Sequence, residues 1–142
     1  MSVFDVARYI LDKQGRMSSW KLQKLCYYAQ AWTLAWKEVP LFDEDFEAWA
    51  NGPVCPALFF ANQGKYMIAP EMIDGKPSKL TEDQKENINI VLKSYGDKDA
   101  YWLREQTHGE DPWRDARGNL PEGAKCNNVI TKDAMGLYYS SL

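Results

Sequence analysis

The segment from Trp20 to Trp36 constrains the fold most, because a helix built from it is apolar around nearly its whole circumference. Ser18 or Ser19 can cap this helix, which is expected to run to about Lys37. Its apolar members are Trp20, Leu22, Leu25, Cys26, Tyr28, Ala29, Trp32, Leu34, Ala35 and Trp36. A helix that is apolar on every side packs against several neighbours. We therefore expect it to be the central helix of the domain.

Aromatic residues supply much of the expected core. The 142 residues include six Trp, eight Tyr and five Phe, and we expect Trp20, Trp32 and Trp49 to be buried. Each fully buried large apolar side chain contributes roughly 1.5–3 kcal/mol to folding. A chain of this length can therefore form one domain over residues 1–142 without a disulfide or a metal.

Cysteine usage, charge and hydropathy all favour a soluble cytoplasmic protein. The three cysteines Cys26, Cys55 and Cys126 are odd in number and form no CxxC pair, which is typical of reduced thiols. The 17 basic and 20 acidic side chains give a net charge of −3, and Lys21 and Lys24, which share a polar helix edge, do not make a phosphate track. We expect no specific nucleic-acid binding. No signal peptide or membrane-spanning run is present in the sequence pattern.

The rest of the pattern predicts a mainly α fold, an irregular single-domain bundle of six or seven helices. Helix caps and apolar spacing place the other helices over residues 2–15, 53–64 and 81–96, around 101–103, over 111–117 and from 131 onward. Gly52-Pro53 is interpreted as a helix start. Residues 67–79 are expected to form a loop, with a small β-ribbon near residues 66–80 as an option because Asp74-Gly75 is a hairpin-turn dipeptide.

His108, the only histidine, is the main candidate for chemistry. It could act as a general base with a carboxylate partner, with Cys26 or Cys55 as nucleophile, in a hydrolase or transferase. Both thiols lack the basic neighbours that would lower their pKa. The simpler interpretation is a histidine that bonds the backbone at a helix end, before a helix that Asp111 caps and Pro112 opens. We expect no catalytic residue, cofactor or metal.

Two irregular segments are candidates for contact with a protein partner. The acidic stretch, residues 43–47, could steer a basic partner, although a solvated loop needs no such role. The apolar loop, residues 66–79, is flexible and could adapt its shape to the partner. The candidate contact residues are Phe42, Asp43, Glu44, Asp45, Phe46, Met67, Ile68, Met72 and Ile73. Neither segment is large enough alone for a standard interface, so we expect them to act jointly.

Two motifs resemble those of a known family. The first comprises Lys21-Leu22-Gln23-Lys24-Leu25, Tyr27-Tyr28-Ala29, Trp32, Pro40-Leu41-Phe42, Glu47-Ala48-Trp49 and Gly52-Pro53-Val54, and the second comprises Thr107-His108, Pro112-Trp113 and Ala116-Arg117. Together they resemble the Panacea domain of the SocA-like antitoxin family, which is also labelled GepA-like phage-associated proteins. The resemblance implies a scaffold role for Lys21, Leu22, Lys24, Leu25, Tyr28, Trp32, Trp49, Gly52, Pro53, His108, Pro112 and Trp113.

The function that the resemblance implies is neutralisation of a toxin. The expected protein is an antitoxin-like binding protein of a bacterial, phage or prophage toxin–antitoxin system that contacts its protein toxin directly and has no catalytic activity. A phage-associated protein that binds a host factor is the alternative binding function, and the His108 enzyme is the alternative from another class. The sequence names neither the toxin nor the oligomeric state, and a homo-oligomer is compatible with it.

Overall fold

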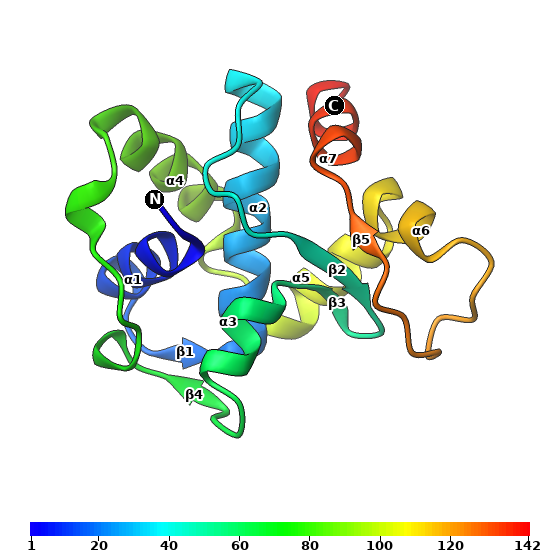
Figure 1. The fold of residues 1–142 in the computed structure, drawn as a ribbon, viewed down its shortest axis with the longest axis horizontal. Coiled ribbons are helices and arrows are strands. Elements are labelled where there is room, and N and C mark those ends of the chain that lie inside the picture. Colours follow the sequence, from blue (N-terminus) through cyan, green and yellow to red (C-terminus); the bar gives the residue numbers. More distant parts are fainter.

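The computed structural model describes residues 1–142 as seven helices with two small sheets (Figure 1). The helices are α1 (Val3–Gln14), α2 (Ser19–Lys37), α3 (Pro56–Ala61), α4 (Glu82–Tyr95), α5 (Ala100–His108), α6 (Asp111–Arg117) and α7 (Lys132–Ser140). The strands are β1 (Met17–Ser18), β2 (Phe46–Trp49), β3 (Gly52–Val54), β4 (Met67–Ile68) and β5 (Val129–Ile130). The predicted mainly α bundle is confirmed. None of the helices is both long and apolar enough to cross a lipid bilayer.

Helix α2 is the centre of the fold, as the sequence predicts. Every residue from Leu22 to Ala31 is buried, so the middle of the helix has no solvent-facing side. Figure 1 shows α2 upright, with α1 and α4 on one side and α7 on the other, and all three pack on it. Ser18 caps its first turn by accepting from the Lys21 N–H. Helices α1, α4 and α7 are therefore arranged around this one helix.

Local caps fix several helix ends where the sequence predicts them. Ser2 and Asp5 form a capping box on α1, and Thr81 and Gln84 form another on α4. Each box satisfies backbone N–H groups that the first helical turn leaves free. The hydroxyl of Thr131 caps α7 in the same way by accepting from the Ala134 N–H. These boundaries depend on residues within one turn, which explains why the sequence identifies them.

The third helix begins later than predicted. Residues 52–54 form β3, which pairs antiparallel with β2, and α3 begins at Pro56 after Cys55. β3 is at the edge of a sheet with the order β3-β2-β5. An edge strand tolerates Pro53 because the missing N–H would face away from the ladder. Pro56, and not Pro53 as the sequence predicts, is the proline at the helix start.

The ribbon near residues 66–80 differs from a local hairpin. β4 pairs with β1, which is distant in sequence, and the following chain makes two short 3-10 turns at 70–72 and 77–79. Gly75 does not make a hairpin turn. It packs against the start of α1, where a Cβ atom at position 75 would lie 2.1 Å from the Phe4 carbonyl oxygen. The Lys76 N–H next to it donates to Asp5 Oδ1 at 2.7 Å.

The expectation that Trp20, Trp32 and Trp49 are fully buried is wrong, because all three are half-buried. An indole N–H needs a polar partner, and such partners are more common near the surface. Trp32 donates to the Tyr95 hydroxyl at 3.1 Å, and Trp49 donates to Glu47 Oε1 at 2.8 Å.

Candidate functional site

A buried carboxylate joins the two motifs to the last helix. Glu110 Oε1 accepts from the hydroxyls of Tyr28 at 2.8 Å and Tyr139 at 2.7 Å, and its Oε2 accepts from the Gln106 amide at 3.1 Å. Burial, reinforced by the neighbouring carboxylate, raises the pKa of Tyr28 and Tyr139, so both hydroxyls remain donors. A buried charge with three donors is a satisfied structural element. The cluster ties Tyr28 of α2 to Tyr139 of α7 through one carboxylate.

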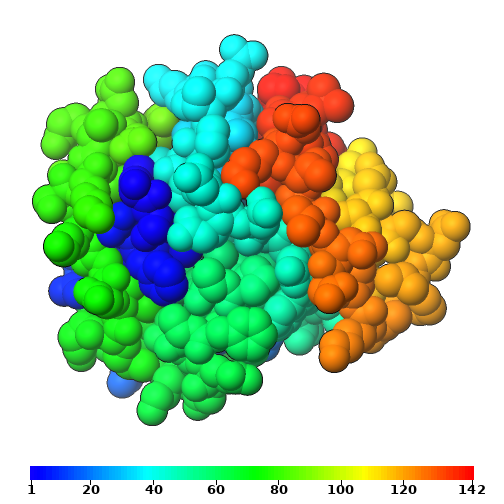
Figure 2. Space-filling model, viewed as in Figure 1, coloured from blue at the N-terminus to red at the C-terminus, as the bar shows by residue number.

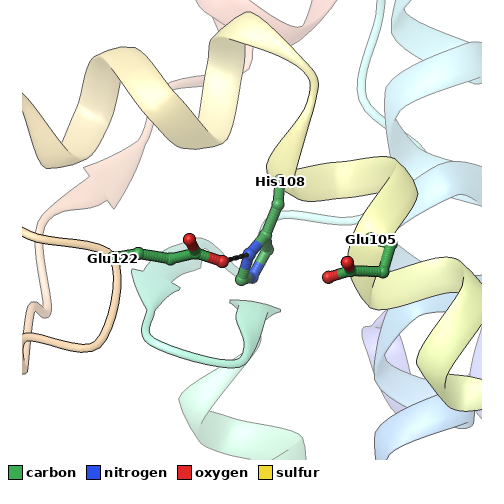
Figure 3. Close-up of side chains that lie close together, drawn as sticks. All are labelled: Glu105, His108 and Glu122. Carbon is green, nitrogen blue, oxygen red and sulfur yellow. Dashed lines mark hydrogen bonds and ion pairs between the residues drawn. The ribbon is translucent and has the colours of Figure 1, made fainter.

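His108 lies at the end of α5 and stacks on Trp113, with 3.8 Å between ring centroids and an interplanar angle of 10°. The predicted backbone bond is wrong, because Nδ1 pairs instead with Glu122 Oε1 at 3.0 Å (Figure 3). The segment after α6 brings Glu122 there as it folds around Arg117, which bonds three of its carbonyl groups. Asp111 is also not the cap of α6, whose N-cap is Glu110.

Glu105, His108 and Glu122 place three donor atoms within 4.8 Å of one another, which is the spacing of a metal site. Figure 3 shows the two carboxylates on opposite sides of the imidazole. Arg104, however, already pairs with Glu105 at 2.7 Å and lies 4.0 Å from Glu122. A metal ion would have to displace these pairs, so the cluster has the chemistry of an ion-pair network.

The same geometry disfavours acid–base chemistry at His108. Nδ1 is occupied by Glu122, and Nε2 is buried without a hydrogen-bond partner. Burial, opposed by the Glu122 bond, lowers the pKa of His108. The thiols proposed as nucleophiles are buried, and burial raises the pKa of both Cys26 and Cys55. A protonated buried thiol is a poor nucleophile.

The candidate partner-contact residues divide into two groups. Phe42, Phe46, Ile68 and Ile73 are each at most 2% exposed, so the expectation that they face a partner is wrong. The chain after α2 folds back across the core and buries both phenylalanines, and the Gln30 amide holds it there by donating to the Phe42 carbonyl at 2.7 Å. The residues of this set that retain exposed surface are Asp43, Glu44, Asp45, Met67 and Met72.

Much of the acidic stretch is also tied to the fold. Asp45 pairs with Lys132 at 2.7 Å, and the same ammonium group donates to the Asp43 carbonyl at 2.9 Å. Glu44 Oε1 accepts from the Val3 N–H at 3.1 Å. Only the Asp43 carboxylate is free of such bonds. The stretch therefore fastens α7 and the N-terminus to the core, and a smaller part of it is available to a partner.

Sequence reasoning missed an exposed aromatic surface at the end of the molecule that carries α3. A cleft of about 650 Å³, which we name the aromatic cleft, is lined by Trp49, Asn51, Pro56 and Phe60 among others. Phe60 is 59% exposed, whereas the neighbouring Phe59 packs on Trp49 at 4.9 Å between centroids. A signal was present, because two adjacent phenylalanines in a short helix point in different directions.

A smaller pocket of about 180 Å³ adjoins the aromatic cleft and shares Asn51 with it. We name it the Lys24 pocket. Its lining residues are Trp20, Lys24, Asn51, Ala100, Tyr101 and Arg104. The expected polar edge shared by Lys21 and Lys24 is wrong, because Lys24 is only 1% exposed.

Comparison with known proteins identifies the family of the chain. Residues 22–114, which contain most of both motifs, match the family described as Antitoxin SocA-like, Panacea domain. Antitoxin SocA of Caulobacter vibrioides (strain NA1000 / CB15N) is 34% identical to the chain over 148 aligned positions, covering 90% of this chain and 79% of that protein. No solved structure matches it. The chain therefore belongs to the SocA-like antitoxin family with a Panacea domain.

Proposed function

We propose that this protein is the antitoxin of a toxin–antitoxin pair, and that it neutralises a protein toxin by direct contact without catalysis. The observation that carries the proposal is the 34% identity to Antitoxin SocA, which extends over 90% of the chain. The likeness thus includes the scaffold motifs and also the segments around them. A binding function is further supported by the buried thiols and by the ion-paired histidine, since neither group is poised for catalysis.

The aromatic cleft is the surface that best suits a protein partner. Centres of protein interfaces are enriched in Trp, Tyr, Phe and Met, and the cleft provides Trp49 and Phe60. Tyr66, in the turn after α3, is 69% exposed, and Met67 beside it is 38% exposed. Large apolar side chains that share one cleft, as Trp49 and Phe60 do, mark an interaction site more strongly than single ones do.

The exposed residues of the acidic stretch and of the apolar loop are part of the same proposed interface. Figure 2 shows residues 40–46, in cyan to teal, and residues 66–80, in green, on one face of the molecule. Within these two segments the exposed Asp43 carboxylate supplies negative charge, and the exposed Met67 and Met72 supply adaptable apolar contact. A standard interface of about 800 Å² per partner can extend from these residues toward the aromatic cleft.

Co-expression tests the function. Each small reading frame beside the gene is expressed from an inducible promoter, with and without this protein, and growth is recorded. We expect one neighbour to stop growth alone and to be harmless with the wild-type protein, and the pair to co-purify. Phe60→Ser should reduce the rescue, whereas the matched control Leu137→Ser, at a 76% exposed site on α7, should not. Co-purification with a host protein, and no rescue of any neighbour, would instead favour the host-factor alternative.

A further inference from the structure

Lys24 is a buried lysine without a hydrogen-bonding or ion-pairing partner inside the protein. It is 1% exposed, yet no carboxylate lies within ion-pair distance of its ammonium group and no acceptor receives a hydrogen bond from it. Lys21, one turn earlier on α2, shows the ordinary arrangement, because its ammonium group donates to the Gly96 carbonyl at 2.7 Å. Lysine is almost never fully buried unless it is paired. The unpaired state of Lys24 therefore requires an explanation.

The fold provides a fitted channel for this side chain. A Cβ atom at position 52 would lie 2.7 Å from Lys24 Cε, so any residue other than glycine would force the end of the lysine side chain to shift. Gly52 also has a φ of +112°, which few other residues adopt. The ammonium group makes a cation–π contact with Trp20, 5.1 Å from the centre of its ring. Residues of α2 and β3 thus direct the charged end of Lys24 into the pocket.

This arrangement is costly for stability alone. Burial, with a smaller effect of the Arg104 charge, lowers the pKa of Lys24 to about 7. A leucine or methionine could fill the same channel without desolvating an ammonium group. Residues that violate the rules of core packing occur preferentially at functional sites. The channel, the pocket and the unpaired charge together indicate that the missing partner comes from outside the chain.

The pocket has the charge and size for one small anion. Besides Lys24 it contains Arg104, whose guanidinium is partly neutralised by Glu105 at 2.7 Å. The first turn of α5 also borders it, and the positive end of a helix favours an anion. The net positive charge near the pocket is thus about one, which suits a monoanion better than a phosphate dianion. Its volume of about 180 Å³ is below the 300–1,000 Å³ typical of sites for larger ligands.

We propose that the Lys24 pocket binds a carboxylate presented by an acidic side chain or chain terminus of the partner protein. That the ligand comes from a partner rests on the proposed function. The position of the pocket supports it, because Asn51 lines both this pocket and the aromatic cleft. A partner segment that places a carboxylate against Lys24 and Arg104 can therefore place its neighbouring apolar side chains against Trp49 and Phe60.

Binding of the carboxylate is coupled to uptake of a proton by Lys24. The other charged or titratable groups near it on α2 and α5 are Lys21, which is bonded to Gly96, Arg104 and Glu105, which pair with each other, and His108, which pairs with Glu122; β3 carries none. An anion favours the charged ammonium form, so affinity should rise as the pH falls toward and below 7. Acetate stays ionised over pH 6–8, and a pH dependence that persists in His108→Asn but is lost in Lys24→Met is assigned to Lys24.

Acetate is the probe for the isolated protein. Sodium acetate is titrated against sodium chloride of equal ionic strength, and the indole N–H of Trp20 is followed by NMR. We expect a saturable shift that acetate causes and chloride does not, with affinity about tenfold higher at pH 6 than at pH 8. Lys24→Met and Arg104→Gln should abolish or weaken it at least about tenfold. Lys37→Met, which removes the same charge from the far end of α2, should leave it unchanged.

Three results of this titration would overturn the site: no shift beyond that of chloride, a shift that persists in both variants, or tighter saturation by inorganic phosphate than by acetate.

A second experiment measures binding of the toxin identified by co-expression. There Lys24→Met should weaken the complex by at least about tenfold and Lys37→Met should not. If Lys24→Met no longer binds acetate yet binds the toxin with wild-type affinity, no carboxylate of the toxin occupies the pocket, and the antitoxin function is unaffected. If no toxin is found, the acetate titration still decides whether the pocket binds a carboxylate.

Discussion

The indole N–H of Trp113 donates a hydrogen bond of 2.9 Å to the backbone carbonyl of Trp49, and this bond joins the second sequence motif to the first. The next carbonyl along β2, that of Ala48, accepts from Arg117 at 2.9 Å. The Arg117 guanidinium in turn lies 4.9 Å from the centre of the Trp113 ring. Two donors from α6 therefore fix β2, and with it the Trp49 wall of the aromatic cleft.

Replacing Trp113 with phenylalanine should show how much this connection contributes. The variant keeps an aromatic ring beside His108 but leaves the Trp49 carbonyl without its donor. We expect a loss of about 2–3 kcal/mol in the free energy of unfolding, from the unpaired acceptor and the smaller ring. Urea unfolding followed by circular dichroism measures it. Trp36→Phe, at an exposed indole on α2, should change stability by less than about 0.5 kcal/mol. Equal losses of stability in the two variants would show that the Trp113 hydrogen bond does not stabilise the fold.

The Glu110 cluster predicts a difference between two adjacent tyrosines. Tyr139→Phe removes a buried donor to a carboxylate and should cost about 1.5–3 kcal/mol. Tyr138→Phe is the matched control, because its hydroxyl makes no hydrogen bond within the protein and it lies on the same helix. Thermal unfolding of the two variants at pH 7 gives the comparison. Similar melting temperatures would mean that the Glu110 bond does not stabilise the fold.

Lys24 gives stability an unusual dependence on pH. Its pKa is about 7 in the folded protein and near 10.5 in the unfolded chain, so between these values the unfolded state binds more protons. Stability should therefore rise with pH from about 7 toward 10, by up to about 1.4 kcal/mol per unit. Lys24→Met should remove this rise and be at least as stable as wild type at pH 7. Urea unfolding at pH 7, 8 and 9 measures the free energy of unfolding of both proteins. If it changed with pH in the same way for wild type and for Lys24→Met, burial of the Lys24 ammonium group would be contradicted.

The features that the sequence predicts correctly depend on neighbouring residues. The capping box of Ser2 and Asp5 and the cap at Ser18 lie within one helical turn. The central position of α2 follows from a run of apolar residues on one element. Membership of the family was also predictable, because its two motifs can be identified without knowing how they meet in space.

The features that the sequence does not predict depend on distant partners. Phe42 resembles an exposed loop residue until Gln30 is seen to bond its carbonyl group. Lys24 resembles a surface lysine until β3 and α5 cover it, and no local pattern indicates that Gly52 opens space for its stem. Glu122 pairs with His108 only because the segment after α6 folds around Arg117. Each error arises where tertiary contacts outweigh local preference.

His108 should prove structural in a functional test. His108→Asn loses both the Trp113 stack and the Glu122 bond, so we expect it to be less stable than wild type but to neutralise the toxin at permissive temperature. Because burial lowers the pKa of His108 below 6.5, wild-type stability should fall as the pH drops below 6.5, and the variant should lack this contribution. Growth rescue at low temperature and unfolding at pH 5 and 7 are the measurements. A folded variant without rescue would show that the imidazole acts directly.

The acidic stretch should affect how fast the toxin binds more than how long it stays bound. Asp43→Lys reverses an exposed charge that makes no ion pair in the protein, so it leaves the Asp45–Lys132 bond intact. If the toxin is basic, this variant should associate several-fold more slowly at 20 mM salt and nearly normally at about 500 mM, because salt screens exposed charges. Stopped-flow or surface-plasmon-resonance kinetics separate the two rates. Glu86→Lys, at an exposed carboxylate on α4 that makes no ion pair, is the matched control for net charge and should slow association less. Wild-type kinetics of Asp43→Lys at every salt concentration would identify the stretch as a solvated loop that fastens α7 to the core.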